Sequence, residues 1–380
     1  MLYEDKKKLV DFDEGIAYTG NLERLKRVFK KAEKEKEKIK IVCLGGSITQ
    51  GSLASRQELC YASRVGEWWK SVFKTSETEL INSGIGGTTS QFGSARANDD
   101  VLAYKPDLVI IEFSVNDSDS IFFRETYEGL VRKIYDSETK PAVILLHNVM
   151  YGDGTNAQDQ HEVIGRYYNV PCLSMKTSVY QAVASGTLKR EEITPDGLHP
   201  NDLGHALLAG LVCSFFENVL KGKILSKPGS REFDVLPGPI TPNGYEKAIR
   251  MQNYNSEPLL EGFEIDPSEQ KHITDIFKRG FIGRKKGDII VFEAKGSELA
   301  AQYRRSVKHP ACICSAVVDG DEENAVILDG NFDETWGDSL SITTLGHGLE
   351  NKIHKVKITV TDGGEDKVPF YLVSLICSGK

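Results

Sequence analysis

A serine at position 47 is the residue of this chain most suited to nucleophilic chemistry. The apolar run at residues 41–44 is typical of a buried strand, and Gly45 and Gly46 end it directly before Ser47. Open α/β sheets place their reactive groups at the carboxyl ends of their strands. A serine hydroxyl is a weak nucleophile without a base, and it can also simply cap the following helix. Ser47 is therefore a candidate nucleophile that needs a base from elsewhere in the chain.

A candidate base lies far downstream, in a turn-rich segment that contains both Asp196 and His199. His199 can take the hydroxyl proton of Ser47 and return it to the leaving group, while Asp196 orients the imidazole and stabilises its cation. By itself, an Asp-x-x-His spacing can also reflect a local cap or hydrogen bond. A second histidine, His205, falls inside the next predicted helix and is interpreted as a partly buried helix residue.

Two further segments can supply hydrogen-bond donors to a developing oxyanion. Gly87 lies in a glycine-rich stretch at residues 82–89, where its N–H is unobstructed, although a turn with positive φ would also select glycine. Asn116 follows an apolar run at residues 108–113, and its amide can donate to an oxyanion or form an Asx turn. The N–H of Ser47, at the start of a helix, is a third candidate donor. Asp117 is expected to brace the loop.

The first 220 residues alternate between short apolar runs and helical patterns, which together must position these groups. Strands are predicted at residues 39–44, 79–81, 108–113, 142–147 and 171–174. Helices are predicted at residues 22–32 (capped by Asn21), 61–74, 123–137, 158–168, 176–185 and 202–220. Continuous apolar strands with helical crossovers indicate a parallel sheet covered on both faces, and hence a three-layer α/β domain.

The pattern changes after residue 222. Residues 223–255 begin with many prolines and glycines and are predicted to be a connector. Residues 256–380 contain short strand-like segments, among them an alternation of Val356, Ile358 and Val360 with polar residues, which favours a β-sandwich or jelly roll. The predicted domains are therefore 1–222 and 256–380. Trp336 lies in a polar loop of the second domain, where it can either pack against its own domain or stack on a sugar ring.

Composition excludes several classes of partner. The formal net charge of −8 argues against a nucleic-acid partner or an anionic membrane surface. No run approaches the roughly 20 apolar residues of a membrane span, and the N-terminus lacks a signal-peptide core, so the chain is predicted to be cytoplasmic. Seven cysteines without a regular framework fit reduced thiols. We find no metal or cofactor motif and expect neither a metal nor a cofactor.

The four blocks, in this order, resemble those of the SGNH/GDSL hydrolases, a family named for its serine, glycine, asparagine and histidine. The matching residues are Ser47, Gly87, Asn116 and His199. The likeness covers about the first 220 residues and implies a flavodoxin-like sheet, the catalytic residues Ser47, Asp196 and His199, and an oxyanion hole of Ser47, Gly87 and Asn116. The chain departs from the family pattern twice, with Gly46 where many members have an acidic residue and with Ser114 where they have glycine.

An SGNH domain followed by a β-sandwich also resembles two-domain carbohydrate acetylesterases of gut bacteria, including mannan-oligosaccharide esterases. Residues 20–25 and 44–55 share in that likeness. It implies an enzyme that removes O-acetyl groups from an acetylated oligosaccharide, with a carbohydrate-binding second domain in which Trp336 contacts the substrate. Two alternatives stay open. One is an SGNH lipase, lysophospholipase or thioesterase, and the other is a glycan-binding protein without hydrolytic activity.

Overall fold

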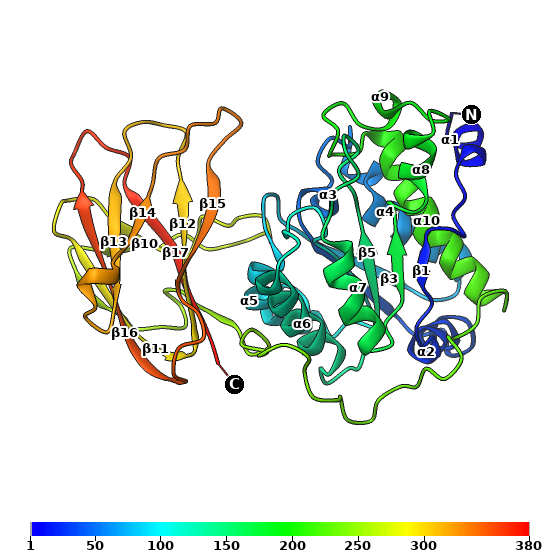
Figure 1. The fold of residues 1–380 in the computed structure, drawn as a ribbon, viewed down its shortest axis with the longest axis horizontal. Helices are drawn as coiled ribbons and strands as arrows, with labels where there is room; N and C mark the ends of the chain where they lie inside the picture. Colours follow the sequence, from blue (N-terminus) through cyan, green and yellow to red (C-terminus); the bar gives the residue numbers. More distant parts are fainter. Residues whose placement is uncertain (1, 380) are drawn as a thin grey trace. The chain divides into compact units, whose positions relative to one another are not determined.

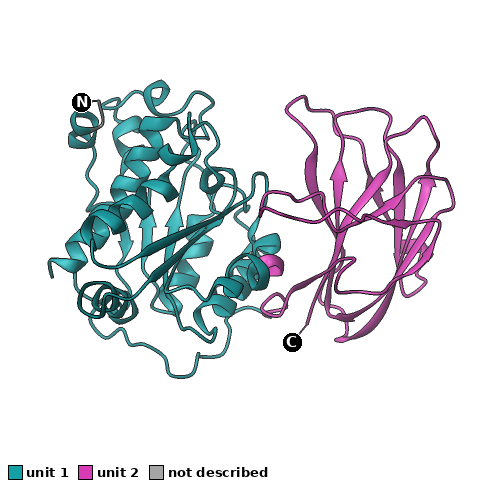
Figure 2. Ribbon diagram, turned by 180° about the vertical axis from the view of Figure 1, so that it is seen from behind, with its two compact units in different colours: residues 1–93, 97–242 teal, residues 94–96, 243–380 magenta. Residues whose placement is uncertain are grey.

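The computed structural model describes residues 2–379 and divides the chain into two compact units (Figure 2). The first unit comprises Met1–Gly93 and Ala97–Pro242, and the second comprises Ser94–Arg96 and Asn243–Lys380. The division at residues 242 and 243 falls inside the segment that the sequence marks as a connector. Its first part therefore belongs to the first unit, and its last part belongs to the second.

The first unit is built around a six-stranded sheet with the strand order β1-β6-β5-β4-β2-β3 (Figure 1). Strands β2 to β6 are parallel to one another, as the sequence predicts, and β1 pairs antiparallel with β6 at one edge. The prediction missed β1 because three residues are too few to show a periodic pattern. The strands are β1 (Ile16–Tyr18), β2 (Ile39–Gly45), β3 (Thr78–Gly84), β4 (Leu108–Glu112), β5 (Ala142–His147) and β6 (Cys172–Ser174).

Helices cover both faces of this sheet. On one face α10 packs against α4 and α2, and on the other α6 and α7 pack against each other and against β5, with α5 beside α6 (Figure 1). The sequence did not predict α5, because its small and polar residues form no apolar stripe. The helices are α1 (Leu2–Lys6), α2 (Glu23–Lys30), α3 (Ser47–Gln50), α4 (Tyr61–Val72), α5 (Ser90–Asp100), α6 (Ile121–Tyr135), α7 (Gln158–Tyr167), α8 (Val179–Ala184), α9 (Arg190–Ile193) and α10 (Asp202–Leu220).

Helix α10 is the most apolar helix of the first unit. By length and composition alone it could cross a membrane, although the sequence analysis found no run of that kind. Of its most apolar stretch, 67% is buried, and residues such as Leu207, Leu211 and Phe216 belong to the core cluster that includes Trp69. These contacts are those of the central helix of a globular core.

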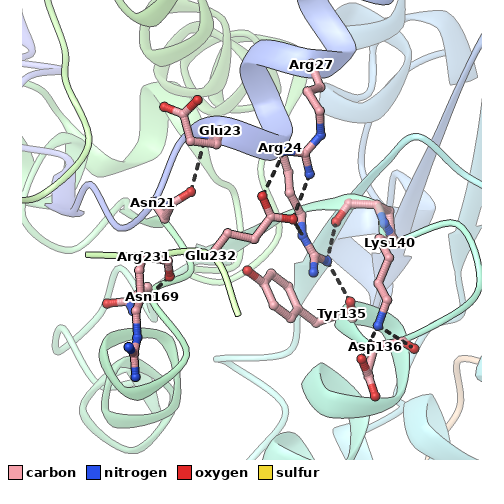
Figure 3. Close-up of polar contacts among 11 residues, drawn as sticks. Asn21, Glu23, Arg24, Arg27, Tyr135, Asp136, Lys140, Asn169, Arg231 and Glu232 are labelled. Carbon is pink, nitrogen blue, oxygen red and sulfur yellow. Dashed lines mark hydrogen bonds and ion pairs between the residues drawn. The ribbon is translucent and has the colours of Figure 1, made fainter. Parts of the chain in front are cut away.

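The connector is tied to the first unit by a partly buried ion pair (Figure 3). Glu232 accepts hydrogen bonds from Arg24 Nε at 2.9 Å and from Arg27 Nη2 at 2.7 Å. The guanidinium of Arg24 is nearly buried, lies 3.5 Å from the centroid of the Tyr135 ring, and donates to the Tyr135 carbonyl at 2.6 Å. Charge-assisted hydrogen bonds are stronger than neutral ones, so this part of the connector, residues 226–241, is a strap bound to α2.

A second carboxylate holds the end of the strap. Glu128 is fully buried on α6 and accepts the backbone N–H groups of Ile240 and Thr241, each at 2.8 Å. A buried carboxylate without such donors would carry a large desolvation cost. Residues 226–241 are therefore bound to the first unit and do not form a flexible linker.

The second unit consists of two antiparallel sheets that enclose their own core, as the β-sandwich prediction requires. Val356, Ile358 and Val360 are fully buried there, which confirms the predicted alternation. One sheet has the order β15-β12-β17-β10-β9 with β7 beside β17, and the other has the order β14-β13-β16-β11-β8. The strands are β7 (Ile249–Met251), β8 (Leu259–Glu261), β9 (Glu264–Ile265), β10 (Phe281–Gly283), β11 (Ile289–Gly296), β12 (Glu298–Arg305), β13 (Ile313–Val318), β14 (Val326–Asp329), β15 (Ser339–Gly346), β16 (Lys352–Asp362) and β17 (Phe370–Ser378).

Candidate active site

Ser47 lies at the carboxyl end of β2, as the first residue of the short helix α3. Its Oγ lies 2.8 Å from Nε2 of His199, and Nδ1 of the same ring lies 2.7 Å from Oδ2 of Asp196. Because a carboxylate only accepts hydrogen bonds, the proton of the neutral ring sits on Nδ1, and Nε2 is free to accept the serine proton. The fold thus brings the three sequence-predicted catalytic residues into one hydrogen-bonded chain.

Asp196 is held by its own loop. Its Oδ1 accepts the backbone N–H groups of Leu198 at 2.9 Å and His199 at 2.8 Å, together with the Thr194 hydroxyl at 3.1 Å. Partial burial by itself would raise the pKa of this carboxyl, but the bonds from the His199 ring and the two N–H groups outweigh burial and lower the pKa to about 2. Asp196 is therefore charged at neutral pH, which favours the cation that His199 forms when it accepts a proton.

The glycine-rich loop after β3 leaves one N–H group available to an oxyanion. Gly86 donates its N–H to Oε1 of Gln50 at 2.6 Å, whereas the N–H of Gly87 has no acceptor within residues 2–379. Gly87 has φ of +68° and no atom within 4 Å of the position that a Cβ would take. A left-handed backbone, and not crowding, therefore explains the glycine at this position.

The side chain of Asn116 lies beside the nucleophile turn. Its Oδ1 is buried without a hydrogen-bond partner in the described part of the chain, and a Cβ on Gly46 would collide with this atom. The other polar atom of this amide, Nδ2, carries two N–H donors. Gly46, one of the two departures from the family pattern, thus leaves the space that Asn116 occupies. Ser114, the other departure, is buried and donates its hydroxyl to the carbonyl of Asn148 at 2.9 Å.

His205 is a residue whose contacts the sequence analysis did not foresee. It is fully buried on α10, accepts the N–H of Tyr61 on Nδ1 at 3.3 Å, and donates from Nε2 to the carbonyl of Ser52 at 3.1 Å. Its neighbour on the same helix, Asp202, accepts from the N–H and hydroxyl of Ser55 at 2.8 and 2.6 Å. These bonds tie the loop that follows Ser47 to the helix that follows His199.

The buried state of His205 makes stability depend on pH. Burial lowers the pKa of His205 to about 4, below the usual 6.5, so the unfolded chain takes up the proton first as the pH falls. The stability that neutral His205 contributes is complete above pH 6.5 and is lost between pH 6.5 and 4, by about 3 kcal/mol. Urea unfolding across this range should show a steeper loss in the wild type than in His205→Gln. Parallel pH profiles would contradict the assignment.

Glu112 and His147 end adjacent strands and are both fully buried, so neither lies at a solvent rim. Burial raises the pKa of Glu112 to about 7, and Thr49 donates to Glu112 Oε2 at 3.3 Å. Burial and the nearby His161 lower the pKa of His147 well below its usual value, which keeps this ring neutral. Neither side chain is exposed to solvent, so neither is a candidate catalytic group.

The geometry defines the class of protein. A serine at a strand end, a histidine within hydrogen-bond distance, a charged aspartate behind it and free donors on neighbouring loops are the parts of a serine hydrolase. Across residues 2–379, no group of three or more His, Cys, Asp or Glu side chains could hold a metal ion.

Trp336 lies in the second unit and is 66% exposed.

Comparison with known proteins identifies the family. Residues 43–207 match the GDSL-like Lipase/Acylhydrolase family. Two solved structures of a two-domain esterase active on acetylated mannans, one co-crystallized with mannopentaose, are 51% and 52% identical to this chain, with TM-scores of 0.93. Each match covers 98% of this chain, and 98% and 99% of those chains. An acetylxylan esterase from Geobacillus stearothermophilus is 28% identical over 169 residues, 39% of this chain and 77% of that relative.

The chain therefore belongs to the GDSL-like Lipase/Acylhydrolase family, which confirms the resemblance stated from the four sequence blocks. It is a carboxylic ester hydrolase of the SGNH type with a second, β-rich domain.

Proposed function

We propose that this esterase removes O-acetyl groups from acetylated mannan oligosaccharides. The hydrogen-bonded chain from Ser47 through His199 to Asp196 is the observation that carries the proposal. Its substrate class is supported by the likeness, over nearly the whole length of both chains, to a two-domain esterase active on acetylated mannans. A cytoplasmic location, with oligosaccharides as substrates, is part of the same proposal.

In the proposed mechanism Ser47 Oγ attacks the acetyl carbonyl while its proton passes to Nε2 of His199. The oxyanion that forms accepts hydrogen bonds from the N–H groups of Ser47 and Gly87 and from the Asn116 amide. The cation of His199, stabilised by Asp196, then protonates the sugar oxygen, and the deacetylated sugar leaves. His199 next takes a proton from water, the resulting hydroxide attacks the acetyl-serine, and acetate is released with Ser47 regenerated.

Acyl-chain length separates this proposal from the lipase or thioesterase alternative. We expect p-nitrophenyl acetate to be the best substrate in a series from acetate to octanoate, because the relatives act on acetyl groups. We also expect the enzyme to release acetate from acetylated mannan oligosaccharides, which mass spectrometry can measure. An octanoate rate well above the acetate rate would favour a lipase, and no turnover of any ester would favour a non-hydrolytic glycan-binding protein.

The exposed loop that carries Trp336 supports a role in binding sugar. Trp336 packs edge-on against Phe332, with ring centroids 5.1 Å apart and planes at 86°, and the Arg305 guanidinium lies 4.9 Å from the centroid of the Phe332 ring. The loop therefore holds the tryptophan while most of its surface stays in solvent, where it can stack on a sugar ring.

Trp336→Ala should weaken turnover of acetylated oligosaccharides by about 1 kcal/mol, or roughly fivefold in kcat/KM, the scale of one aromatic contact. Turnover of p-nitrophenyl acetate should be unchanged, because this ester needs no sugar platform. Comparing the two substrates is the measurement. Equal losses on both would assign Trp336 to folding, and no loss on either would remove it from the substrate-binding surface.

A further inference from the structure

Asp117, the neighbour of Asn116, connects two loops of the proposed oxyanion hole. One loop carries the Gly87 N–H, and the other carries the Asn116 amide. Its Oδ1 accepts the N–H of Ser90 at 2.9 Å, and Ser90 begins α5 three residues after Gly87. Its Oδ2 lies 3.0 Å from Nε2 of His161, on α7. The side chains of Asp117 and His161 are both completely buried. One carboxylate thus connects the Gly87 loop to the Asn116 loop.

The His161 ring is itself held in place. It stacks face to face on Tyr127 of α6, with centroids 3.6 Å apart and planes inclined by 2°. Its Nδ1 has no hydrogen-bond partner in the described residues, so its polar contact is the one to Asp117 through Nε2. Because an ionised carboxylate only accepts, Nε2 carries the proton and donates. Helices α5, α6 and α7 therefore together determine where Asp117 lies.

The loop that carries Asn116 is equally constrained. The N–H groups of Asn116 and Asp117 both donate to the Phe113 carbonyl, at 3.0 and 2.9 Å. This tight turn leaves little freedom between the Asp117 carboxylate and the Asn116 amide. Movement of Asp117 would therefore move Asn116 as well, and would also release the N-terminus of α5 beside the Gly87 loop.

We propose that Asp117 and His161 are positioning residues that set the separation between the Gly87 N–H and the Asn116 amide. The inference rests on the proposed function, since it assigns both donors to the oxyanion. Hydrogen-bond donors stabilise an oxyanion strongly only when they are already in place, because no energy is then spent on reorganising them during the reaction. The buried, charge-assisted hydrogen bonds of Asp117 hold the donors in place before the reaction begins.

His161→Phe tests the proposal, since phenylalanine can keep the stack on Tyr127 but removes the donor to Asp117. We expect kcat on p-nitrophenyl acetate to fall about ten- to a hundredfold, less than the roughly 10²–10³ for outright loss of one oxyanion donor, while KM changes less than twofold. His161→Gln, which keeps a donor, should recover most of the loss. All variants are assayed well below their melting temperatures.

A double-mutant cycle with Asn116→Ala separates positioning from general loss of structure. In the Asn116→Ala background, His161→Phe should lower kcat only a few fold, because one of the donors that His161 positions is already absent. The matched control is His354→Phe in the second unit, where His354 is buried and its Nδ1 lies 2.8 Å from Oδ2 of Asp319. This control should lower the melting temperature and leave kcat unchanged.

Equal fold losses from His161→Phe in both backgrounds, or a lower melting temperature with kcat unchanged, would overturn the positioning role. If Asn116→Ala by itself left kcat unchanged, the oxyanion assignment would fall, and the inference would fall with it. A large loss in Asn116→Ala combined with additive losses would overturn only the inference. The two failures are therefore distinguishable.

Discussion

Ser47→Ala is expected to abolish ester hydrolysis. Removal of Oγ takes away the atom that attacks the acetyl carbonyl, and His199 at 2.8 Å is left with no nucleophile to activate. Removing a member of such a triad typically leaves a residual rate about 10³–10⁴ above that in water, which for an acetyl ester is far below wild-type turnover. Steady-state hydrolysis of p-nitrophenyl acetate measures the loss.

The fold of the Ser47→Ala variant should be intact, since the alanine keeps the backbone that starts α3. Ser52→Ala is a suitable control, because Ser52 lies in the loop after Ser47 and contributes its backbone carbonyl, not its hydroxyl, to His205. This control should keep both its activity and its melting temperature. Turnover near the wild-type rate in Ser47→Ala would remove Ser47 from the mechanism.

Asn116→Ala is expected to lower kcat by about 10²–10³ with little change in KM. The reason is that the amide is proposed to donate to the oxyanion of the transition state and not to the ground-state ester. Its Oδ1 makes no hydrogen bond within residues 2–379, so truncation removes few native contacts, and the melting temperature should change little.

Ser118→Ala, in the same loop but with an exposed hydroxyl that donates to Ser120, is the matched control and should retain full activity. A rise in KM with kcat unchanged in Asn116→Ala would mean that Asn116 binds substrate equally in the ground and transition states. The assignment of Asn116 to the oxyanion hole would then be wrong.

The sequence alone was enough to predict the parallel sheet, the β-rich second domain and the four blocks of the site. Strand β2 is a continuous apolar run because both faces of a central parallel strand are covered, so its signal is local and strong. The turn that exposes Ser47 is also local, since two glycines end the strand directly before it. Family resemblance then linked Ser47 to the distant pair Asp196 and His199.

Other elements carried too little local signal. Strand β1 has three residues, and α5 is held by contacts such as that of Gly93 against the Phe113 ring, where a larger side chain would collide. The first part of the connector was predicted only as a connector, and its pattern did not show that Glu232 binds it to Arg24 and Arg27, far earlier in the sequence. Such pairs depend on the topology that brings them together.

The identity of the reacting groups was thus predictable from the sequence, through the residue types after strands β2 and β4 and the family resemblance that added Asp196 and His199. The hydrogen bonds that hold these groups in place depend on the tertiary structure. They are the bonds of His205 to Ser52 and Tyr61 and the bond of Asp117 to His161. A buried histidine and a surface histidine are the same letter in a sequence. Only packing removes water from one of them and decides which groups its two ring nitrogens meet, as it does for His205 and His161.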